Sequence, residues 1–342
     1  MADRVYCTYF DQSYLSRGLA LYHSLQRHSP GARLWVLCLS DECYRTLATL
    51  DLPHLIPRPL SEFEAADPEV AATRPTRSVL EYYFTCSPAW MLFVLAREPD
   101  AEWVTYLDGD LFFFESPEAI YRELQGAAVA ITPHRYTAKI SRLLRFGTYN
   151  VGWVGARNDS DGIAVITWWR QKCIEWCHDY VDGDRFADQG YLNSFSSRFQ
   201  RVKIIENFGA NLAPWNLGNY RIDFRDNRVM IDAICPLIFF HFQGLKRDLG
   251  WFIFNSHRVY RAPFSGDVRK YIYKPYIDEL LAIERKIGPI LQLSDVKPHR
   301  RSAVVDVRQH LESKARSIRG RIFQLLDIVT GRAFVVLRDK AY

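Results

Sequence analysis

Short apolar runs alternate with amphipathic segments along the first fifty residues of the chain. Residues 5–9 and 34–39 are mainly apolar runs of strand length, and a helical pattern follows each of them. In the first of these helices the apolar side chains recur at spacings of three and four residues, at Leu15, Leu19, Tyr22 and Leu25. The second helix is expected over residues 41–50. This strand–helix–strand–helix order predicts an α/β fold with a parallel sheet covered by helices.

Clusters of apolar, aromatic and β-branched residues predict the later strands, at 103–107, 111–114, 127–132, 149–155 and 236–242. Long helices are expected over 78–95 and 163–180, the first of them broken near Ser87-Pro88 by the proline. A connector with several prolines occupies residues 53–75, and residues 186–193 open a short helix. The basic segment 134–145 is either a mobile flap over an anionic ligand or a solvated loop.

Composition places the chain among packed globular proteins, because 48% of its 342 residues are hydrophobic and 14% are aromatic. The N-terminus shows no signal-peptide pattern, and no apolar run approaches 18 residues, so we expect a soluble cytoplasmic protein. The seven cysteines are odd in number and lie mostly in apolar runs, which predicts reduced core thiols. The net charge of +5 comes from residues 297–342, which hold eleven Lys and Arg against four Asp and Glu.

The first strand-to-helix turn lacks both the glycine-rich dinucleotide signature and a phosphate-binding Gly-Lys-Ser/Thr loop, which argues against NAD enzymes and P-loop ATPases. Carboxylates stand instead at the end of a predicted buried strand, in Asp108-Gly109-Asp110. Two unpaired buried carboxylates would be costly, so a hard divalent cation is the favoured partner. Chance is the alternative, because the chain has a second Asp-x-Asp copy, Asp182-Gly183-Asp184, in a polar stretch.

Three further positions carry candidate chemistry. Asn150-Val151-Gly152 belongs to a predicted strand whose glycine permits close approach of a ligand. Asp188-Gln189 opens a predicted helix, where the acid is either an N-terminal cap or a catalytic group. His241 ends an apolar strand and is either a hydrogen-bonded core residue or a third metal ligand.

Together these positions form four blocks in one order: Asp108-Gly109-Asp110, Asn150-Val151-Gly152, Asp188-Gln189-Gly190-Tyr191-Leu192-Asn193 and His241-Phe242-Gln243-Gly244. In this order the chain resembles the retaining sugar transferases of glycosyltransferase family 8, which include glycogenin and bacterial lipopolysaccharide glycosyltransferases. Pro214-Trp215-Asn216 is similar to a later element of that family. The likeness covers residues 4 to 260 and is greatest to transferases of bacterial polysaccharide clusters.

The resemblance implies a GT-A fold over residues 1–262, with a nucleotide-sugar half (1–115) and an acceptor half (116–262). A basic, helical C-terminal extension would occupy residues 263–342. It implies that Asp108, Asp110 and His241 ligate Mn²⁺ or Mg²⁺. Gln189, near the anomeric carbon, and Asp188, on the sugar hydroxyls, would be the catalytic residues. The implied donor-binding residues are Thr8, Asp11, Tyr14, Asp108, Gly109, Asn150, Gly152, Gly244, Lys246 and Arg247, and the implied acceptor-binding residues are Trp215 and Asn216.

The chain departs from the family pattern at two places. The family lysine usually stands six residues after the histidine and precedes Pro-Trp, whereas here Lys246 is five and Arg247 six residues after His241, with no Pro-Trp. Either cation is therefore a candidate for the diphosphate. The acid often found three residues before Asp-Gln is replaced by Arg185, which leaves the donor sugar open.

The resemblance implies metal-dependent transfer of a sugar from a nucleotide donor, in the first place a UDP-sugar, and we expect the transfer to proceed with retention of configuration. The expected acceptor is a glycan or lipid-linked saccharide in bacterial surface polysaccharide synthesis, and no nucleic acid is expected as a partner. An apolar seam with flanking basic residues over 300–329 predicts a helix that either lies on the inner membrane or packs on the chain or a twin subunit. A glycoside hydrolase and a non-catalytic sugar- or nucleotide-binding module are the alternatives.

Overall fold

A seven-stranded mixed sheet forms the centre of the molecule, in the order β3-β2-β1-β4-β7-β6-β8. The computed structural model describes residues 4–248, 251–293, 333–337 and 340–341. The strands of this sheet are β1 (Arg4–Phe10), β2 (Arg33–Cys38), β3 (Leu55–Pro59), β4 (Trp103–Leu107), β6 (Val129–Pro133), β7 (Tyr149–Arg157) and β8 (Val202–Ile204). Strands β2, β1 and β4 are parallel, as predicted, and β3, which the sequence did not predict, is parallel to them; β7 runs antiparallel to both β4 and β6.

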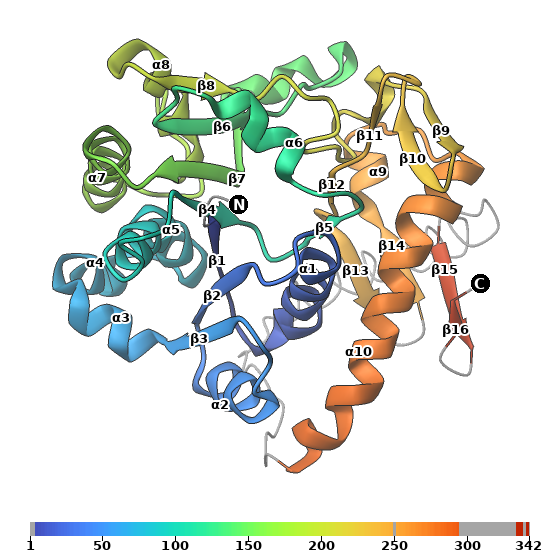
Figure 1. Cartoon of the computed structure of the whole chain (residues 1–342), viewed down its shortest axis with the longest axis horizontal. Coiled ribbons are helices and arrows are strands. Elements are labelled where there is room, and N and C mark those ends of the chain that lie inside the picture. The colour runs from blue at the N-terminus through green and yellow to red at the C-terminus, as the bar shows by residue number, and fades with distance from the viewer. Residues whose placement is uncertain (1–3, 249–250, 294–332, 338–339, 342) are drawn as a thin grey trace, which may run out of the picture.

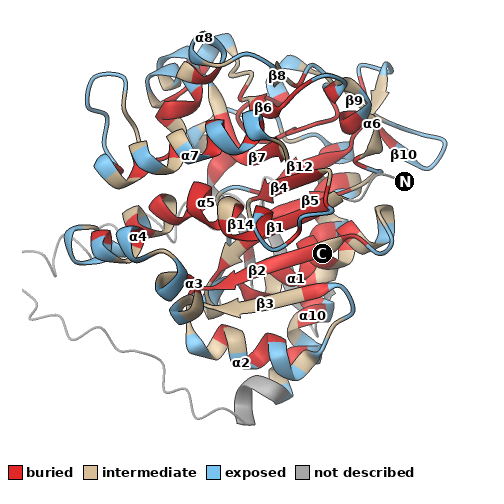
Figure 2. Cartoon of the chain, turned by 60° about the vertical axis from the view of Figure 1, so that its left-hand side comes forward, coloured by how far each residue is buried: buried red, intermediate tan, exposed pale blue. Residues whose placement is uncertain are grey.

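Helices cover both faces of this sheet. The α-helices of the described residues are α1 (Leu15–His28), α2 (Asp41–Leu50), α3 (Leu60–Ala66), α4 (Pro68–Thr73), α5 (Val79–Leu95), α6 (Glu118–Tyr121), α7 (Ser160–Glu175), α8 (Phe195–Arg198), α9 (Asn255–Val259) and α10 (Lys274–Leu293). Figure 1 shows α5 and α7 on one side of the sheet and α1 and α10 on the other. Each side holds its own cluster of buried apolar side chains, and Figure 2 shows the buried strands between them.

Helix α5 corrects one prediction. It runs unbroken from Val79 to Leu95 with Pro88 inside it, so the break expected at Ser87-Pro88 is wrong. A proline within a helix costs about 3 kcal/mol, but most of α5 after Tyr82 is buried against the sheet and α7, and this packing outweighs the cost. A capping box between Ser78 and Glu81 begins the helix.

Smaller sheets surround the central one. Strands β5 (Leu111–Phe113) and β12 (Phe239–His241) form an antiparallel pair, and β9 (Ile222–Arg225), β10 (Arg228–Ile231) and β11 (Cys235–Pro236) form a three-stranded sheet. The remaining sheet contains β13 (Leu245–Asp248), β14 (Trp251–Phe254), β15 (Ala333–Leu337) and β16 (Lys340–Ala341). The predicted amphipathic seam at 300–329 lies outside the described residues.

Helix α10, which follows the predicted boundary at 262, shares its hydrophobic core with α1 and β5. The ring of Tyr276 stacks on Phe242, with centroids 3.8 Å apart, and Glu279 pairs with His23 and Arg27 of α1 at 2.8 and 2.7 Å. Helix α10 therefore supports the strand that carries His241.

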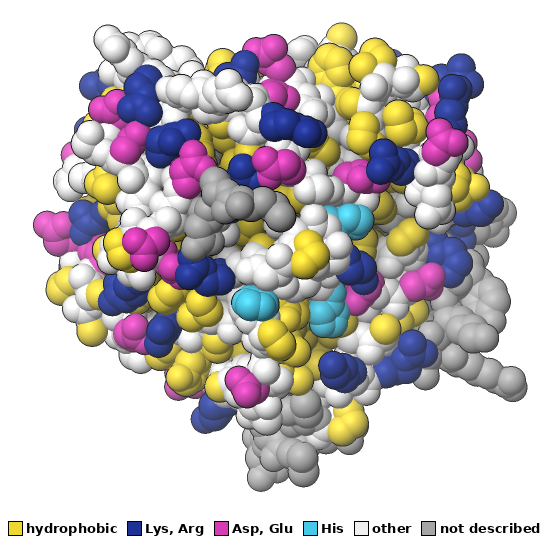
Figure 3. Space-filling model, viewed as in Figure 1, with side chains coloured by type: hydrophobic (Ala, Val, Ile, Leu, Met, Phe, Trp, Pro, Cys, Tyr) yellow, Lys and Arg dark blue, Asp and Glu magenta, His cyan; other side chains and the backbone are white. Residues whose placement is uncertain are grey.

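All seven cysteines are free, and six of them are buried. None of the helices in the described ranges is both long and apolar enough to span a membrane. On the face seen in Figure 3, basic and acidic side chains are interspersed.

Candidate active site

The candidate site lies at one edge of the central sheet, where several elements deliver their functional residues. Strands β1 and β4 are parallel, so their carboxyl ends bring Asp11 and Asp108 to the same edge. Because β7 is antiparallel to β4, its first residues, including Asn150, lie at that edge too. Strand β6 also ends there, immediately before His134. Strand direction therefore gathers residues far apart in the sequence.

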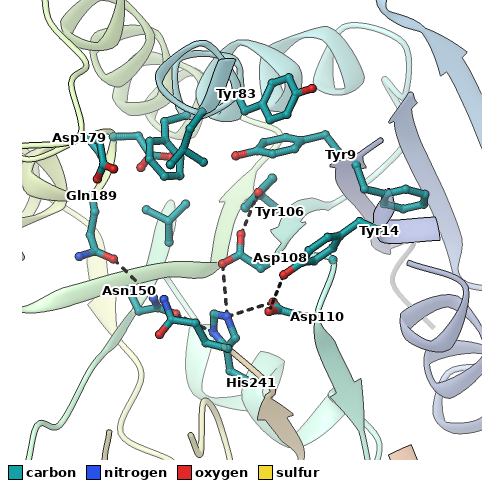
Figure 4. A pocket seen from close by; sticks show the side chains of 18 of the residues that line it. Tyr9, Tyr14, Tyr83, Tyr106, Asp108, Asp110, Asn150, Asp179, Gln189 and His241 are labelled. Carbon is teal, nitrogen blue, oxygen red and sulfur yellow. Dashed lines mark hydrogen bonds and ion pairs between the residues drawn. The ribbon is translucent and has the colours of Figure 1, made fainter. Parts of the chain in front are cut away.

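Asp108, Asp110 and His241 form a cluster whose ligand atoms all lie within 4.8 Å of one another. The two aspartates occupy the turn between β4 and β5. Strand β12 pairs with β5 so that His241 stands opposite Leu111, and the Phe242 amide donates to the Asp110 carbonyl at 3.0 Å. Nε2 of His241 lies 3.1 Å from Oδ1 of Asp110 and 3.6 Å from Oδ2 of Asp108. Figure 4 shows the three side chains directed toward one another.

Each carboxylate of this cluster has a tyrosine on its other oxygen. The hydroxyl of Tyr106 donates to Oδ1 of Asp108 at 2.9 Å, and the hydroxyl of Tyr14 donates to Oδ2 of Asp110 at 3.2 Å. One oxygen of each acid is therefore held by a phenol, and the other faces Nε2 of His241. Two carboxylate oxygens and one imidazole nitrogen suit Mn²⁺, so the residues present fit the metal that the sequence predicts.

Burial and mutual attraction set the protonation of this cluster. Burial raises the pKa of Asp108, and the negative charge of Asp110 adds to the rise. Burial has the same effect on Asp110, but the charge and hydrogen bond of His241, the charge of Arg17 and the hydrogen bond from Tyr14 together hold the pKa of Asp110 below its usual value. Burial alone would lower the pKa of His241, yet the two carboxylates raise it. The two carboxylates thus favour the protonated form of His241, and a bound cation would compete with that proton.

The cluster opens into a cavity of about 750 Å³, a volume suited to a small organic ligand. Ten of the residues predicted from the sequence line it: Asp11, Tyr14, Asp108, Gly109, Asp110, Asn150, Asp188, Gln189, Trp215 and His241. The rest of the lining is largely aromatic, with Tyr9, Tyr83, Phe84, Tyr136, Phe146, Phe186 and Tyr260 among its members.

Five predicted residues do not line this cavity. The side chains of Thr8 and Asn216 are both fully buried. The side-chain oxygen of Asn216 accepts a hydrogen bond from the Ala213 backbone N–H, and its NH₂ group donates to the backbone carbonyls of Asn211 and His134. The others are Gly152, which packs against the His241 ring, Gly244, beside Ser256, and the exposed Lys246. The side chain of Arg247 lies outside what the structure describes.

Asp188 does not cap the short helix η5 (Gln189–Ser194) with its side chain. Its Oδ2 atom instead accepts a hydrogen bond of 2.7 Å from the hydroxyl of Ser87 in α5, and that hydroxyl is 3.2 Å from the Tyr9 hydroxyl. Burial raises the pKa of Asp188 to about 7, with a further contribution from the charge of Asp108. The acid is thus held in the cavity by a helix residue that lies 101 positions earlier in the sequence.

The second Asp-x-Asp copy takes no part in the site. Asp182 and Asp184 are exposed in a turn, where Asp182 pairs with Arg185. In the copy that follows the buried strand, by contrast, Asp110 is buried and Asp108 is half-buried.

Sequence reasoning missed His134, Tyr106 and Ser87 as site residues. His134 directly follows an apolar strand, and this position at the carboxyl end of β6 could have identified it. Tyr106 lies in β4 two residues before Asp108, which directly follows the strand, so the alternation of side chains along β4 could have placed the two on the same side. Ser87 had no local signal, because its role depends on the packing of α5 against η5.

Comparison with known proteins places the chain among uncharacterised relatives. No family model matches the sequence. The chain is 34% identical to the uncharacterized protein YfnD of Bacillus subtilis (strain 168) over 279 residues, which cover 80% of this chain and 87% of YfnD. It is 31% identical to YfnF of the same organism over 248 residues, 70% of this chain and 81% of YfnF.

The fold is similar to that of a solved structure of the galactosyltransferase LgtC in complex with donor and acceptor sugar analogs. The match has a TM-score of 0.51 and 15% sequence identity, and it covers 81% of this chain and 95% of the LgtC chain. The prediction of a GT-A fold is therefore confirmed.

Proposed function

We propose a sugar-transfer function for this chain, which belongs to the family of the Bacillus subtilis proteins YfnD and YfnF. In this proposal the chain is a metal-dependent glycosyltransferase that moves a sugar from a nucleotide-diphosphate donor, in the first place a UDP-sugar, to an acceptor hydroxyl. The main observation in support is that Asp108, Asp110 and His241 converge in the lining of a cavity that Asp188 and Gln189 also line.

The charge of the cavity supports the metal dependence. Five carboxylates line it, those of Asp11, Asp108, Asp110, Asp179 and Asp188, whereas none of the Lys and Arg side chains that the structure describes does so. A diphosphate would be repelled by this lining unless a divalent cation entered with it. When bound, the cation would also offset the charge that accumulates on the departing diphosphate.

The protein's own residues prepare the site for that cation and for the sugar. Tyr106 and Tyr14 hold the two carboxylates so that one oxygen of each stays directed at the metal position. Asp188, fixed by Ser87, can accept a hydrogen bond from a sugar hydroxyl. The proposal places Gln189 beside the anomeric carbon and includes retention of configuration, with attack from the face that the diphosphate leaves. NMR of the product linkage tests this part, and an inverted linkage would reject it.

A panel of nucleotide sugars tested by thermal shift, with Mn²⁺ or with EDTA, examines the proposal directly. We expect one UDP-sugar to raise the melting temperature only when Mn²⁺ is present, because the diphosphate needs the cation. The same donor should be hydrolysed slowly in the presence of Mn²⁺.

Two matched substitutions sharpen the test. Asp110→Asn should abolish the response to Mn²⁺, whereas Asp184→Asn, the same change in the exposed Asp-x-Asp copy, should leave it intact. Donor hydrolysis that is insensitive to EDTA would contradict the metal mechanism and favour a glycoside hydrolase. Donor binding without any turnover would instead indicate a binding module.

Membership of glycosyltransferase family 8 stays a prediction, as does an acceptor among the glycans or lipid-linked saccharides of bacterial surface polysaccharides. The cytoplasmic location, contact with the inner membrane through 300–329 and a homodimer also stay predictions. Liposome flotation of the full chain and of a 1–296 truncation tests the membrane contact, and equal flotation would remove it.

A further inference from the structure

A buried histidine that no sequence motif marks connects to the candidate metal cluster. His134 follows β6, lines the cavity and is only 4% exposed. Its ring stacks on Tyr136, with centroids 4.4 Å apart and planes 11° apart, and meets Trp215 edge-on at 5.4 Å. Burial lowers the pKa of His134 to about 3, so the ring is neutral and carries one hydrogen. Which nitrogen carries it determines the neighbouring hydrogen bonds.

The surroundings of His134 decide its tautomer. Nδ1 lies 3.3 Å from the carbonyl oxygen of Thr148, which can only accept, so Nδ1 carries the hydrogen. Nε2 then has a lone pair, and it lies 3.4 Å from Nδ2 of Asn150. The Asn150 amide therefore directs its NH₂ group toward His134.

The orientation of the Asn150 amide determines what its oxygen does. Nδ2 also donates to Oε1 of Gln189 at 3.4 Å, while Oδ1 accepts the Gly152 amide at 3.1 Å and faces Nδ1 of His241 at 3.3 Å. Because Oδ1 can only accept, Nδ1 of His241 must carry a hydrogen. Nε2 of His241 is then the nitrogen that is left to face the two carboxylates and a metal.

The first and last side chains of this hydrogen-bond chain, His134 and Gln189, both bond to the backbone of one short segment, residues 146–148. Thr148 receives the hydrogen bond from His134, and the Phe146 carbonyl receives one of 2.8 Å from Nε2 of Gln189. Gly147 between them has a φ of +123°, a backbone conformation that favours glycine, and a side chain there would meet Gln189 at 3.3 Å. The segment thus orients the amide of Gln189 and the ring of His134 together.

We propose that His134 is a positioning residue that acts through Asn150 to orient His241, so that Nε2 of His241 is the nitrogen presented to the metal. The inference rests on the metal site proposed above. It concerns which atom donates and which accepts in the hydrogen bonds that link His134, Asn150 and His241. Among the described residues, His134 is not one of the three candidate metal ligands, and its link to them runs through Asn150. Partners that orient a metal-ligating histidine typically change metal affinity about 10- to 100-fold when they are removed.

A crossed pair of substitutions separates positioning from packing. His134→Phe keeps a ring between Tyr136 and Trp215 but removes the acceptor for Asn150. His134→Gln loses the ring but can place Oε1 where Nε2 accepts. We expect His134→Phe to weaken Mn²⁺ binding at least about tenfold and His134→Gln to stay within about threefold of the wild type, measured by EPR with Mn²⁺ alone. The reverse order, or equal losses in both variants, would overturn the proposal.

NMR of ¹⁵N-histidine-labelled wild-type protein gives a second readout that needs no variant to fold. Without metal at pH 7, His134 should be the neutral tautomer with hydrogen on Nδ1. Hydrogen on Nε2, or a charged ring, would overturn the inference. Failure of the wild type to bind Mn²⁺ would reject the proposed function instead, and the His134 spectrum would still decide the hydrogen-bond polarity.

Discussion

Gly152 offers a sharp test of how tightly the metal cluster is packed. It lies in β7, where its amide donates to Oδ1 of Asn150 and its carbonyl accepts from the Asp108 amide. A Cβ atom at this position would lie 2.5 Å from Oδ1 of Asn150 and 2.8 Å from Nδ1 of His241. Contacts below 3.0 Å are essentially never seen for Cβ, so Gly152→Ala must displace the amide, the imidazole or the strand.

The size of the effect follows from the overlap. Relative to a contact of 3.4 Å, the methyl group would be about 0.9 Å too close to Asn150 and about 0.6 Å too close to His241. Overpacking of this kind costs about 1–3 kcal/mol. If the imidazole moves away to relieve it, Mn²⁺ affinity should fall about 10- to 100-fold, since each factor of ten corresponds to about 1.4 kcal/mol. If the ring stays, the same energy should appear as lost stability.

Two measurements on the same variant therefore test the reasoning, namely the Mn²⁺ dissociation constant by EPR and the free energy of unfolding in urea without metal. Gly155→Ala is the matched control, because it lies on the same strand and its Cβ would meet the Trp153 ring at 3.0 Å, remote from the cluster. We expect Gly155→Ala to bind Mn²⁺ as the wild type does. If Gly152→Ala leaves both quantities unchanged, the packing of His241 on β7 described here is wrong.

Three further predictions follow from the same site. Tyr106→Phe removes the phenol that holds Oδ1 of Asp108, and Mn²⁺ binding measured by EPR should weaken about tenfold; an unchanged affinity would show that the phenol does not orient the acid. The raised pKa of Asp188, about 7, means that the folded chain keeps a proton that the unfolded chain releases near pH 4, so wild-type stability relative to Asp188→Asn should fall as pH rises between these values. Metal-free urea unfolding should show a loss of up to about 4 kcal/mol, and a difference independent of pH would refute the burial argument. Finally, the acidic lining should make a UDP-uronate bind more weakly than the matching neutral UDP-hexose in Mn²⁺-containing competition assays, whereas equal binding would indicate a cation at the sugar that the described lining lacks.

The local pattern of apolar residues was sufficient to predict the strands and helices that open the chain and the strand that precedes the two aspartates. The strands at 5–9, 34–39 and 103–107 and the helices that follow the first two were all predicted, because continuous apolar runs and helical spacing are local properties. The proline-containing connector was misread. It contains β3, α3 and α4, whose residues pack against the sheet edge and α5, and prolines at a strand end and at a first helical turn are compatible with both elements.

The site was predicted in part for a related reason. The aspartates, His241, Asn150 and the Asp188-Gln189 pair were all named from the sequence, and the structure brings them to one cavity. Thr8 and Asn216 were also named, but their side chains are buried in the protein interior.

By itself the sequence determined the strands and helices that open the chain, the buried strand before Asp108, and which strand ends carry acids and amides, because apolar runs and helical spacing are local properties. Only the tertiary structure decided that β7 runs antiparallel, that β12 pairs with β5 in the register that faces His241 to the aspartates, and that His134 reaches Asn150. Strand direction, register and the polarity of buried hydrogen bonds arise from contacts between separate segments of the chain. The two residues are 16 positions apart for His134 and Asn150, and more than a hundred apart for the pairing of β5 with β12. The spacing of apolar residues along the sequence does not specify which of these residues will meet.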